Sequence, residues 1–172
     1  MNGAFLLVPL LLIRYGLLSM FGKDAIQRAA FFPPLVGREK TAYYIYQAST
    51  LAIFVYAFFL YVKTDDIWFP IGLAIFGFGI LLCIASVINF AKPSGGGMNI
   101  SGLYTVSRNP MYVSYFMYYL GCVLLTKSIV LLGLLILFQI SSHWIILSEE
   151  RWCRQKFGEA YVRYTEKVRR YL

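Results

Sequence analysis

The stretch that decides the fold is residues 111–147, MYVSYFMYYLGCVLLTKSIVLLGLLILFQISSHWIIL, a nearly continuous apolar run. A helix that crosses a bilayer needs about 20 apolar residues, so this run is too long for a single crossing. A polar tripeptide, Thr126-Lys127-Ser128, lies near its middle. We therefore predict a helical hairpin, with one helix over residues 111–125 and the other over residues 129–147.

Three further apolar windows precede this hairpin, at residues 4–20, 43–62 and 67–91. The chain has 172 residues, of which 59% are hydrophobic and 14% charged, whereas soluble domains carry about a quarter charged residues. We predict an all-α polytopic membrane protein with about five transmembrane helices. Arg14 in the first window, with no basic region before it and no small-residue cleavage site after it, argues against a secretory signal peptide.

The distribution of basic residues predicts the orientation of the five helices. Thirteen of the 16 Lys and Arg residues fall on the side of the C-terminus, Lys63 and Lys127 fall on the other side, and Arg14 lies within a span. Cytoplasmic loops carry an excess of Lys and Arg, so the C-terminus is expected in the cytoplasm. The net charge of +8 is thus explained by membrane topology, and we expect no nucleic-acid partner.

The cysteines give no sign of a disulfide framework or a metal site. Cys83 and Cys122 lie in apolar spans, where a cysteine behaves as a small hydrophobic residue. Neither they nor Cys153 show the paired spacing of metal ligands, so we expect no bound metal.

The C-terminal segment has the pattern of an amphipathic helix. Apolar residues recur at steps of three and four, which places them on one helical face, and the other face is basic. We predict a helix that lies along the cytoplasmic leaflet and is attracted to anionic lipid. Its apolar face consists of Phe157, Tyr161, Tyr164, Val168 and Tyr171.

Polar residues gather in residues 91–110, AKPSGGGMNISGLYTVSRNP, before the hairpin. The run Gly95-Gly96-Gly97 predicts a loop whose backbone can approach a ligand, although a flexible connector has the same composition. Asn109 is a preferred N-cap and Pro110 suits the first helical position. The free N–H groups of that helix end and the adjacent Arg108 would together suit a carboxylate or phosphate. The alternative is an ordinary capped helix with an arginine that reaches the interface.

The second helix of the hairpin supplies the acidic residues. Gln139, His143 and Glu150 share one helical face, and Glu149 flanks it. A polar stripe in an apolar helix is expected to face the bundle interior or a cavity. The alternatives are a solvated Glu-Glu pair and a histidine that only packs in the core.

These motifs, in this order, resemble the integral-membrane methyltransferases of the isoprenylcysteine carboxyl methyltransferase and phospholipid methyltransferase superfamily. The resemblance covers roughly residues 90–172. The chain departs from the carboxyl methyltransferase branch at Asn109, where that branch has histidine, and NPMY is similar to phosphatidylethanolamine N-methyltransferases. The residues that carry the resemblance are Gly102, Tyr104, Arg108, Pro110, Tyr112, Glu149, Glu150, Phe157, Gly158, Tyr161 and Tyr164.

The resemblance implies a single domain that binds S-adenosylmethionine at the cytoplasmic face. Residues 1–91 would form three N-terminal spans and residues 92–172 the catalytic part. The acceptor is expected to be a lipid or another lipophilic molecule that offers a carboxylate, a headgroup amine or a thiol. The candidate cofactor-binding residues are Gly97, Gly102, Tyr104, Asn109, Pro110, Met111, Glu149 and Glu150.

Four residues are candidates for catalysis. We expect Arg108 to orient an anionic acceptor, and Glu150, His143 or Tyr112 to accept the proton of an amine acceptor. Two other interpretations are a sterol-type reductase of the membrane that uses NADPH, and a membrane scaffold without catalytic activity.

Overall fold

The computed structural model describes residues 1–65, 67–94 and 96–172, and these residues form an all-helical protein, as predicted. Within those ranges, β-type pairing is limited to isolated bridges. The elements are, in chain order, η1 (Gly3–Leu7), α1 (Val8–Leu11), η2 (Leu12–Leu17), α2 (Lys23–Ala30), α3 (Arg38–Ala57), α4 (Trp68–Ala91), η3 (Gly102–Thr105), α5 (Pro110–Thr126), α6 (Ile129–Phe157) and α7 (Glu159–Lys167).

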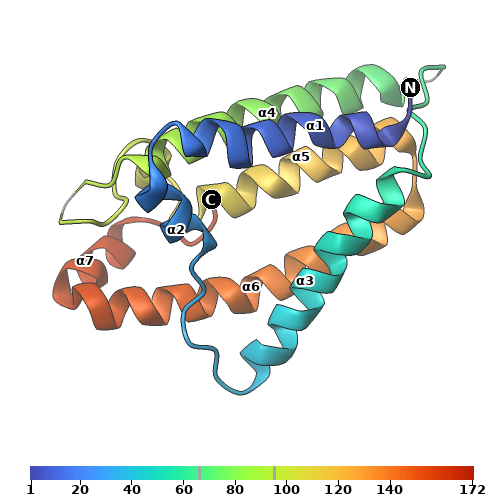
Figure 1. The fold of residues 1–172 in the computed structure, drawn as a ribbon. Helices are drawn as coiled ribbons and strands as arrows, with labels where there is room; N and C mark the ends of the chain where they lie inside the picture. Colours follow the sequence, from blue (N-terminus) through green and yellow to red (C-terminus); the bar gives the residue numbers. More distant parts are fainter. Residues whose placement is uncertain (66, 95) are drawn as a thin grey trace.

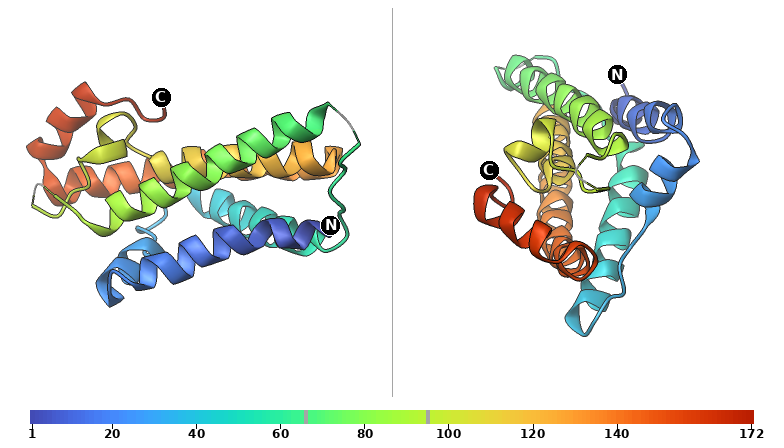
Figure 2. Two further views of the ribbon diagram at one scale, coloured as in Figure 1. Left: turned by 90° about the horizontal axis from the view of Figure 1, so that it is seen from above. Right: turned by 90° about the vertical axis from the view of Figure 1, so that its left-hand side faces the viewer.

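The helices form two layers that meet at one end and spread apart at the other. In Figure 1, α1, α4 and α5 run side by side in one layer, and α3 and α6 form the second. The layers converge near the turn between α5 and α6. At the spread end lie α2, α7 and the loop that precedes α5, as the two further views in Figure 2 also show.

Glycines bring the backbones of α4 and α5 into direct contact. A Cβ atom on Gly79 would lie 2.6 Å from the Cα atom of Tyr118, and one on Gly121 would lie 2.5 Å from the Cα atom of Phe76. Small residues permit this close approach between apolar helices. The rings of Phe76 and Tyr118 pack beside the contact with their centroids 4.9 Å apart.

We expect Gly121→Ala to destabilise the protein by about 1–3 kcal/mol, because the new methyl group would press on backbone atoms that cannot rotate away. Gly133→Ala is the matched control, since a Cβ atom there has no neighbour within 4 Å. Thermal unfolding in detergent measures both effects. Equal melting temperatures for Gly121→Ala and the wild-type protein would contradict the close α4–α5 contact.

The predicted break within residues 111–147 is confirmed. Lys127 adopts a left-handed conformation with φ +51°, which ends α5. The side chain of Ser128 then accepts a hydrogen bond of 3.1 Å from the backbone N–H of Leu131 and caps α6. The second helix is longer than predicted, because α6 continues without interruption to Phe157.

The predicted span over residues 43–62 ends too late, because α3 stops at Ala57. The following residues pair with the N-terminus instead of continuing the helix. Leu60 O accepts a hydrogen bond of 2.7 Å from Gly3 N, and Val62 N donates one of 2.9 Å to Met1 O.

Two helices in the described part of the chain, α4 and α6, are long and apolar enough to cross a membrane. The N-terminal rod Gly3–Leu17 is a shorter apolar helix. The number of five spans and their orientation remain predictions.

The predicted C-terminal face is correct only in part. Gly158, with φ +53°, separates α6 from α7, and α7 ends at Lys167. Val168 is extended, so Val168 and Tyr171 do not continue the helical face. Residues 168–172, called the tail below, instead run beside the segment that precedes α5, where Arg108 N donates a 2.9 Å hydrogen bond to Arg169 O.

Candidate active site

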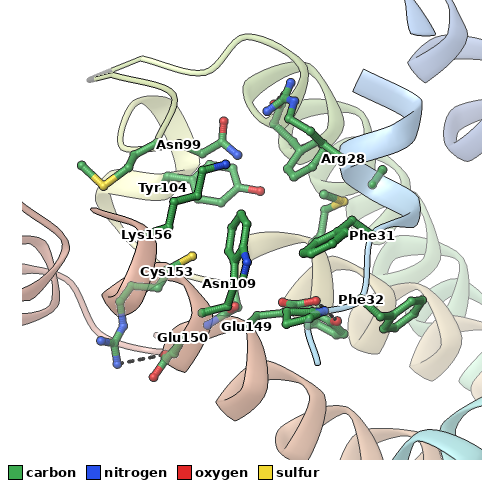
Figure 3. A pocket seen from close by; sticks show the side chains of 18 of the residues that line it. Arg28, Phe31, Phe32, Asn99, Tyr104, Asn109, Glu149, Glu150, Cys153 and Lys156 are labelled. Atoms are coloured by element: carbon green, nitrogen blue, oxygen red, sulfur yellow. Dashed lines mark hydrogen bonds and ion pairs between the residues drawn. The ribbon is translucent and has the colours of Figure 1, made fainter. Parts of the chain in front are cut away.

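A cavity of about 640 Å³ lies at the spread end of the two layers. This volume is in the range of small-molecule sites, about 300–1,000 Å³. Figure 3 shows Arg28, Phe31 and Phe32 on one side of the cavity and Asn99, Tyr104 and Lys156 on the other. Eight of the residues predicted to form the site line it together: Gly97, Tyr104, Arg108, Asn109, Met111, Tyr112, Glu149 and Glu150.

The loop before α5 is held against α4 at Gly102. This glycine has φ +60°, and a Cβ atom on it would collide with the side-chain amide of Asn89. Asn89 Oδ1 accepts a hydrogen bond of 2.8 Å from Leu103 N. Gly102 does not line the cavity. Its role is to let the loop pack closely on α4, and this places Tyr104 at the cavity. Gly97 reaches the lining directly, whereas Gly95, also part of the predicted glycine loop, lies outside the described residues.

The start of α5 is as predicted, but its capping hydrogen bond is not. Asn109 occupies the N-cap position and Pro110 the first helical position. The Asn109 side chain makes no capping bond and instead donates from Nδ2 to Arg170 O at 3.1 Å. The Asn109 side chain therefore links the start of α5 to the tail through its Nδ2 donor, and its Oδ1 atom does not cap the helix. Pro110 is buried and does not line the cavity.

The two adjacent glutamates have different surroundings. Both carboxylate oxygens of Glu150 accept hydrogen bonds from Arg170, from Nε at 3.0 Å and from Nη2 at 2.9 Å. Arg108 Nη2 lies 3.2 Å from the same Glu150 Oε1 atom. Glu149 instead accepts a hydrogen bond of 3.0 Å from the Tyr112 hydroxyl. Since two guanidinium groups already surround Glu150, Glu149 is the more accessible carboxylate for a ligand.

Two buried polar atoms of the cavity wall have no hydrogen-bond partner among the described residues. They are the donor Arg108 Nε and the acceptor Asn99 Oδ1. Leaving such groups unpaired costs about 1–3 kcal/mol each, and a ligand that pairs with them would recover this energy. Two residues that line the cavity thus each carry a buried polar atom, one donor and one acceptor, without a partner in the described part of the chain.

The N-terminal third of the chain contributes cavity residues that the sequence analysis missed. Arg14, from η2, donates to Tyr115 Oη at 2.9 Å and to Ala29 O at 2.8 Å. Arg28, from α2, donates to Phe90 O at 3.2 Å and lies over the Phe90 ring. An arginine within an apolar span is a signal of a functional site, and Arg14 carried that signal.

Aromatic side chains cover much of the cavity wall. Trp152 packs against Phe31 with ring centroids 5.1 Å apart, and Lys156 Nζ lies 4.5 Å from the centre of the Trp152 ring. Tyr164 donates to Tyr104 O at 2.6 Å. Burial raises the pKa of Tyr164 to about 12 and also raises the pKa of Tyr161, so both phenols stay neutral. Such a wall offers flat apolar faces for a planar ring.

His143 lies away from these residues. Its Nδ1 atom is 2.7 Å from the Tyr171 hydroxyl, and it does not line the cavity. His143 contacts the tail and lies outside the cavity, so it is not positioned to accept a proton from a ligand there.

Comparison with known proteins identifies related chains. Residues 68–160, more than half of the chain, match the phospholipid methyltransferase family. A steroid 5-alpha-reductase, DET2 of Solanum lycopersicum, is 36% identical over 107 residues, which cover 59% of this chain and 42% of that protein. The chain thus spans less than half the length of this relative. No solved structure matches.

Proposed function

Because the chain belongs to the phospholipid methyltransferase family, within the isoprenylcysteine and phospholipid methyltransferase superfamily, we propose that it transfers a methyl group from S-adenosylmethionine to a lipophilic acceptor. One observation above all supports this proposal. The cavity combines an accessible carboxylate, Glu149, with an arginine, Arg108, that has an unpaired donor.

The cavity residues fit the chemical groups of S-adenosylmethionine. The unpaired Nε of Arg108, beside the amino end of α5, suits the donor's carboxylate. Glu149 and the unpaired Asn99 Oδ1 suit its ammonium group or ribose hydroxyls, and the aromatic wall around Trp152 suits adenine. When bound, the cofactor supplies a methyl group on a positively charged sulfonium.

The protein's own contribution is to orient the reactants and to keep water out. Methyl transfer needs the acceptor about 3 Å from the methyl carbon in a geometry ready for reaction. The aromatic residues that line the cavity would limit the access of water to the reacting groups. An amine acceptor must also lose a proton. Of the three predicted bases, Glu150 is paired with two guanidinium groups and His143 lies outside the cavity. Tyr112, which lines the cavity and hydrogen-bonds to Glu149, is therefore the base that we propose.

We also propose a membrane arrangement in which five helices cross the bilayer and the cavity opens near the cytoplasmic face. The excess of Lys and Arg on the C-terminal side supports this orientation. Residues 92–172 would carry most of the catalytic groups. Arg14 and Arg28, which come from the first 91 residues, also line the cavity, and this supports a single domain.

A membrane reductase is the second candidate, favoured by the similarity to the tomato steroid 5-alpha-reductase. Basic side chains that line the cavity would also suit the phosphates of NADPH. They are Arg14, Arg28, Arg108 and Lys156. The match covers 42% of that protein, so its activity is the weaker proposal for this chain.

Ligand protection separates the two candidates. A ligand present at 100 times its Kd stabilises a protein by about 2.7 kcal/mol. For a chain of this length that corresponds to a rise in melting temperature of about 5–10 °C. We expect this rise with S-adenosylhomocysteine and not with NADPH. The reverse result would support the reductase, and no rise with either ligand would support a scaffold.

The acceptor can be identified by labelling. Purified protein is incubated with radiolabelled S-adenosylmethionine and total host membrane lipid, and the lipid classes are then separated. Label in one lipid class would identify the acceptor type. Absence of label from every lipid class, together with absence of protection by S-adenosylhomocysteine, would contradict the proposed function.

A further inference from the structure

The tail is attached to the cavity wall at several points, although it lies beyond α7. Arg169 O accepts a 2.9 Å hydrogen bond from Arg108 N, and Arg170 O accepts one of 3.1 Å from Asn109 Nδ2. The Tyr171 hydroxyl lies 2.7 Å from His143 Nδ1 on α6. The backbone is thus held at Arg169 and Arg170, and the next residue is held through its side chain, so the Arg170 side chain has a defined position next to Glu150.

Arg170 and Arg108 approach Glu150 from different sides. Arg108 lines the cavity, whereas Arg170 lines a separate groove on the other side of Glu150. The Arg170 side chain is 32% exposed, but those of Arg108 and Glu150 are only 10% and 5% exposed. The carboxylate therefore forms a partition between a buried arginine in the cavity and a more exposed arginine outside it.

The two arginines do not share Glu150 equally. Arg170 makes the bidentate contact, with one hydrogen bond to each carboxylate oxygen. Arg108 makes a single contact at 3.2 Å, and its Nε atom has no partner among the described residues. Two positive charges thus face one negative charge, which leaves one positive charge in excess. Arg108 makes the longer contact with Glu150 and has an unpaired Nε atom, so the positive charge that Glu150 does not neutralise lies at Arg108.

We propose that Arg170 is a positioning residue that, by occupying both oxygens of Glu150, leaves the charge of Arg108 available to the carboxylate of the ligand in the cavity. This inference rests on the proposed function for the identity of that ligand. Without Arg170, the free Glu150 oxygens and the unpaired Arg108 Nε would form a bidentate pair, the favoured geometry of arginine with a carboxylate. Arg108 would then be neutralised and its Nε atom paired with Glu150.

The test compares Arg170→Gln with Arg170→Lys and with Arg163→Gln. Arg163 is an exposed residue of α7, so its change removes the same charge at a surface position. Two probes are titrated by thermal shift: S-adenosylhomocysteine, and 5′-methylthioadenosine, which lacks the carboxylate. We expect Arg170→Gln to weaken S-adenosylhomocysteine binding by about tenfold or more and to leave 5′-methylthioadenosine binding unchanged. Arg170→Lys is expected to restore part of the loss, and Arg163→Gln to behave as wild type.

A purely structural role would weaken both nucleosides equally and would overturn the inference, as would unchanged affinity for both. Inorganic pyrophosphate provides a probe that does not depend on the proposed function, because it carries charge without a nucleoside. Suppose that S-adenosylhomocysteine does not stabilise the wild-type protein, but that pyrophosphate stabilises wild type more than Arg170→Gln. In that case only the methyltransferase proposal fails. If pyrophosphate stabilises Arg170→Gln and wild type equally, the inference about Arg170 fails.

Discussion

In the proposed reaction, Arg108→Ala is expected to leave a folded protein that transfers methyl groups about 10- to 100-fold more slowly than wild type, the range for the loss of a hydrogen bond between a charged group and the ligand. The substitution removes the guanidinium that lines the cavity and its unpaired Nε donor. It does not leave an isolated buried carboxylate, because Glu150 keeps both of its hydrogen bonds to Arg170. The loss should therefore appear in ligand binding and turnover, and much less in stability.

Transfer from radiolabelled S-adenosylmethionine to membrane lipid, together with the melting temperature, measures the two effects of Arg108→Ala separately. Arg108→Lys is the informative control, since lysine keeps the charge but loses the planar fork that pairs with a carboxylate. We expect its activity to lie between those of wild type and Arg108→Ala. If Arg108→Ala retains wild-type turnover, Arg108 has no role in the proposed reaction.

Glu149→Gln is expected to raise the Kd for S-adenosylhomocysteine by about 10- to 100-fold, the range for a lost hydrogen bond to a charged group. Within the described ranges, the Tyr112 hydroxyl is the one hydrogen-bond partner of the Glu149 carboxylate. The remaining capacity of that carboxylate faces the cavity, where it can accept bonds from an ammonium group or a ribose. The amide keeps the shape of the side chain but removes its charge.

Two further variants make the result for Glu149 specific. Tyr112→Phe removes only the neutral partner, so its effect on affinity should be smaller than that of Glu149→Gln. Glu159→Gln makes the same chemical change at an exposed position on α7 and should bind as wild type does. Binding by Glu149→Gln that equals that of Glu159→Gln would remove Glu149 from the cofactor site.

The sequence was most informative where structure is determined locally. The apolar run 111–147 is too long for one crossing, and a polar tripeptide near its middle is the natural place for a break, which the structure has at Lys127. The residues near Arg108 and Glu149 could be identified from the sequence because each motif spans only a few positions. The hairpin between the two motifs returns the chain to the same end of the bundle, so both motifs reach the cavity.

Contacts between distant segments were not predictable in the same way. No local pattern shows that Arg14 reaches Tyr115, about one hundred residues later, or that Arg170 pairs with Glu150 across the turn at Gly158. His143 shares a helical face with Glu150, but seven residues along a helix is a distance of about 10 Å. The cavity includes Glu150 and does not extend to His143.

The hydrogen bonds of Arg14 to Tyr115 and to Ala29 O connect the N-terminal rod to the wall of the cavity, so the C-terminal half cannot form the cavity alone. A fragment that begins near residue 90 would retain the motifs of the family. It would lack the side of the cavity that the N-terminal part of the chain forms. Chimeric proteins made from relatives should therefore exchange the N-terminal rod together with the hairpin α5–α6, because the two parts contact each other through Arg14 and Tyr115.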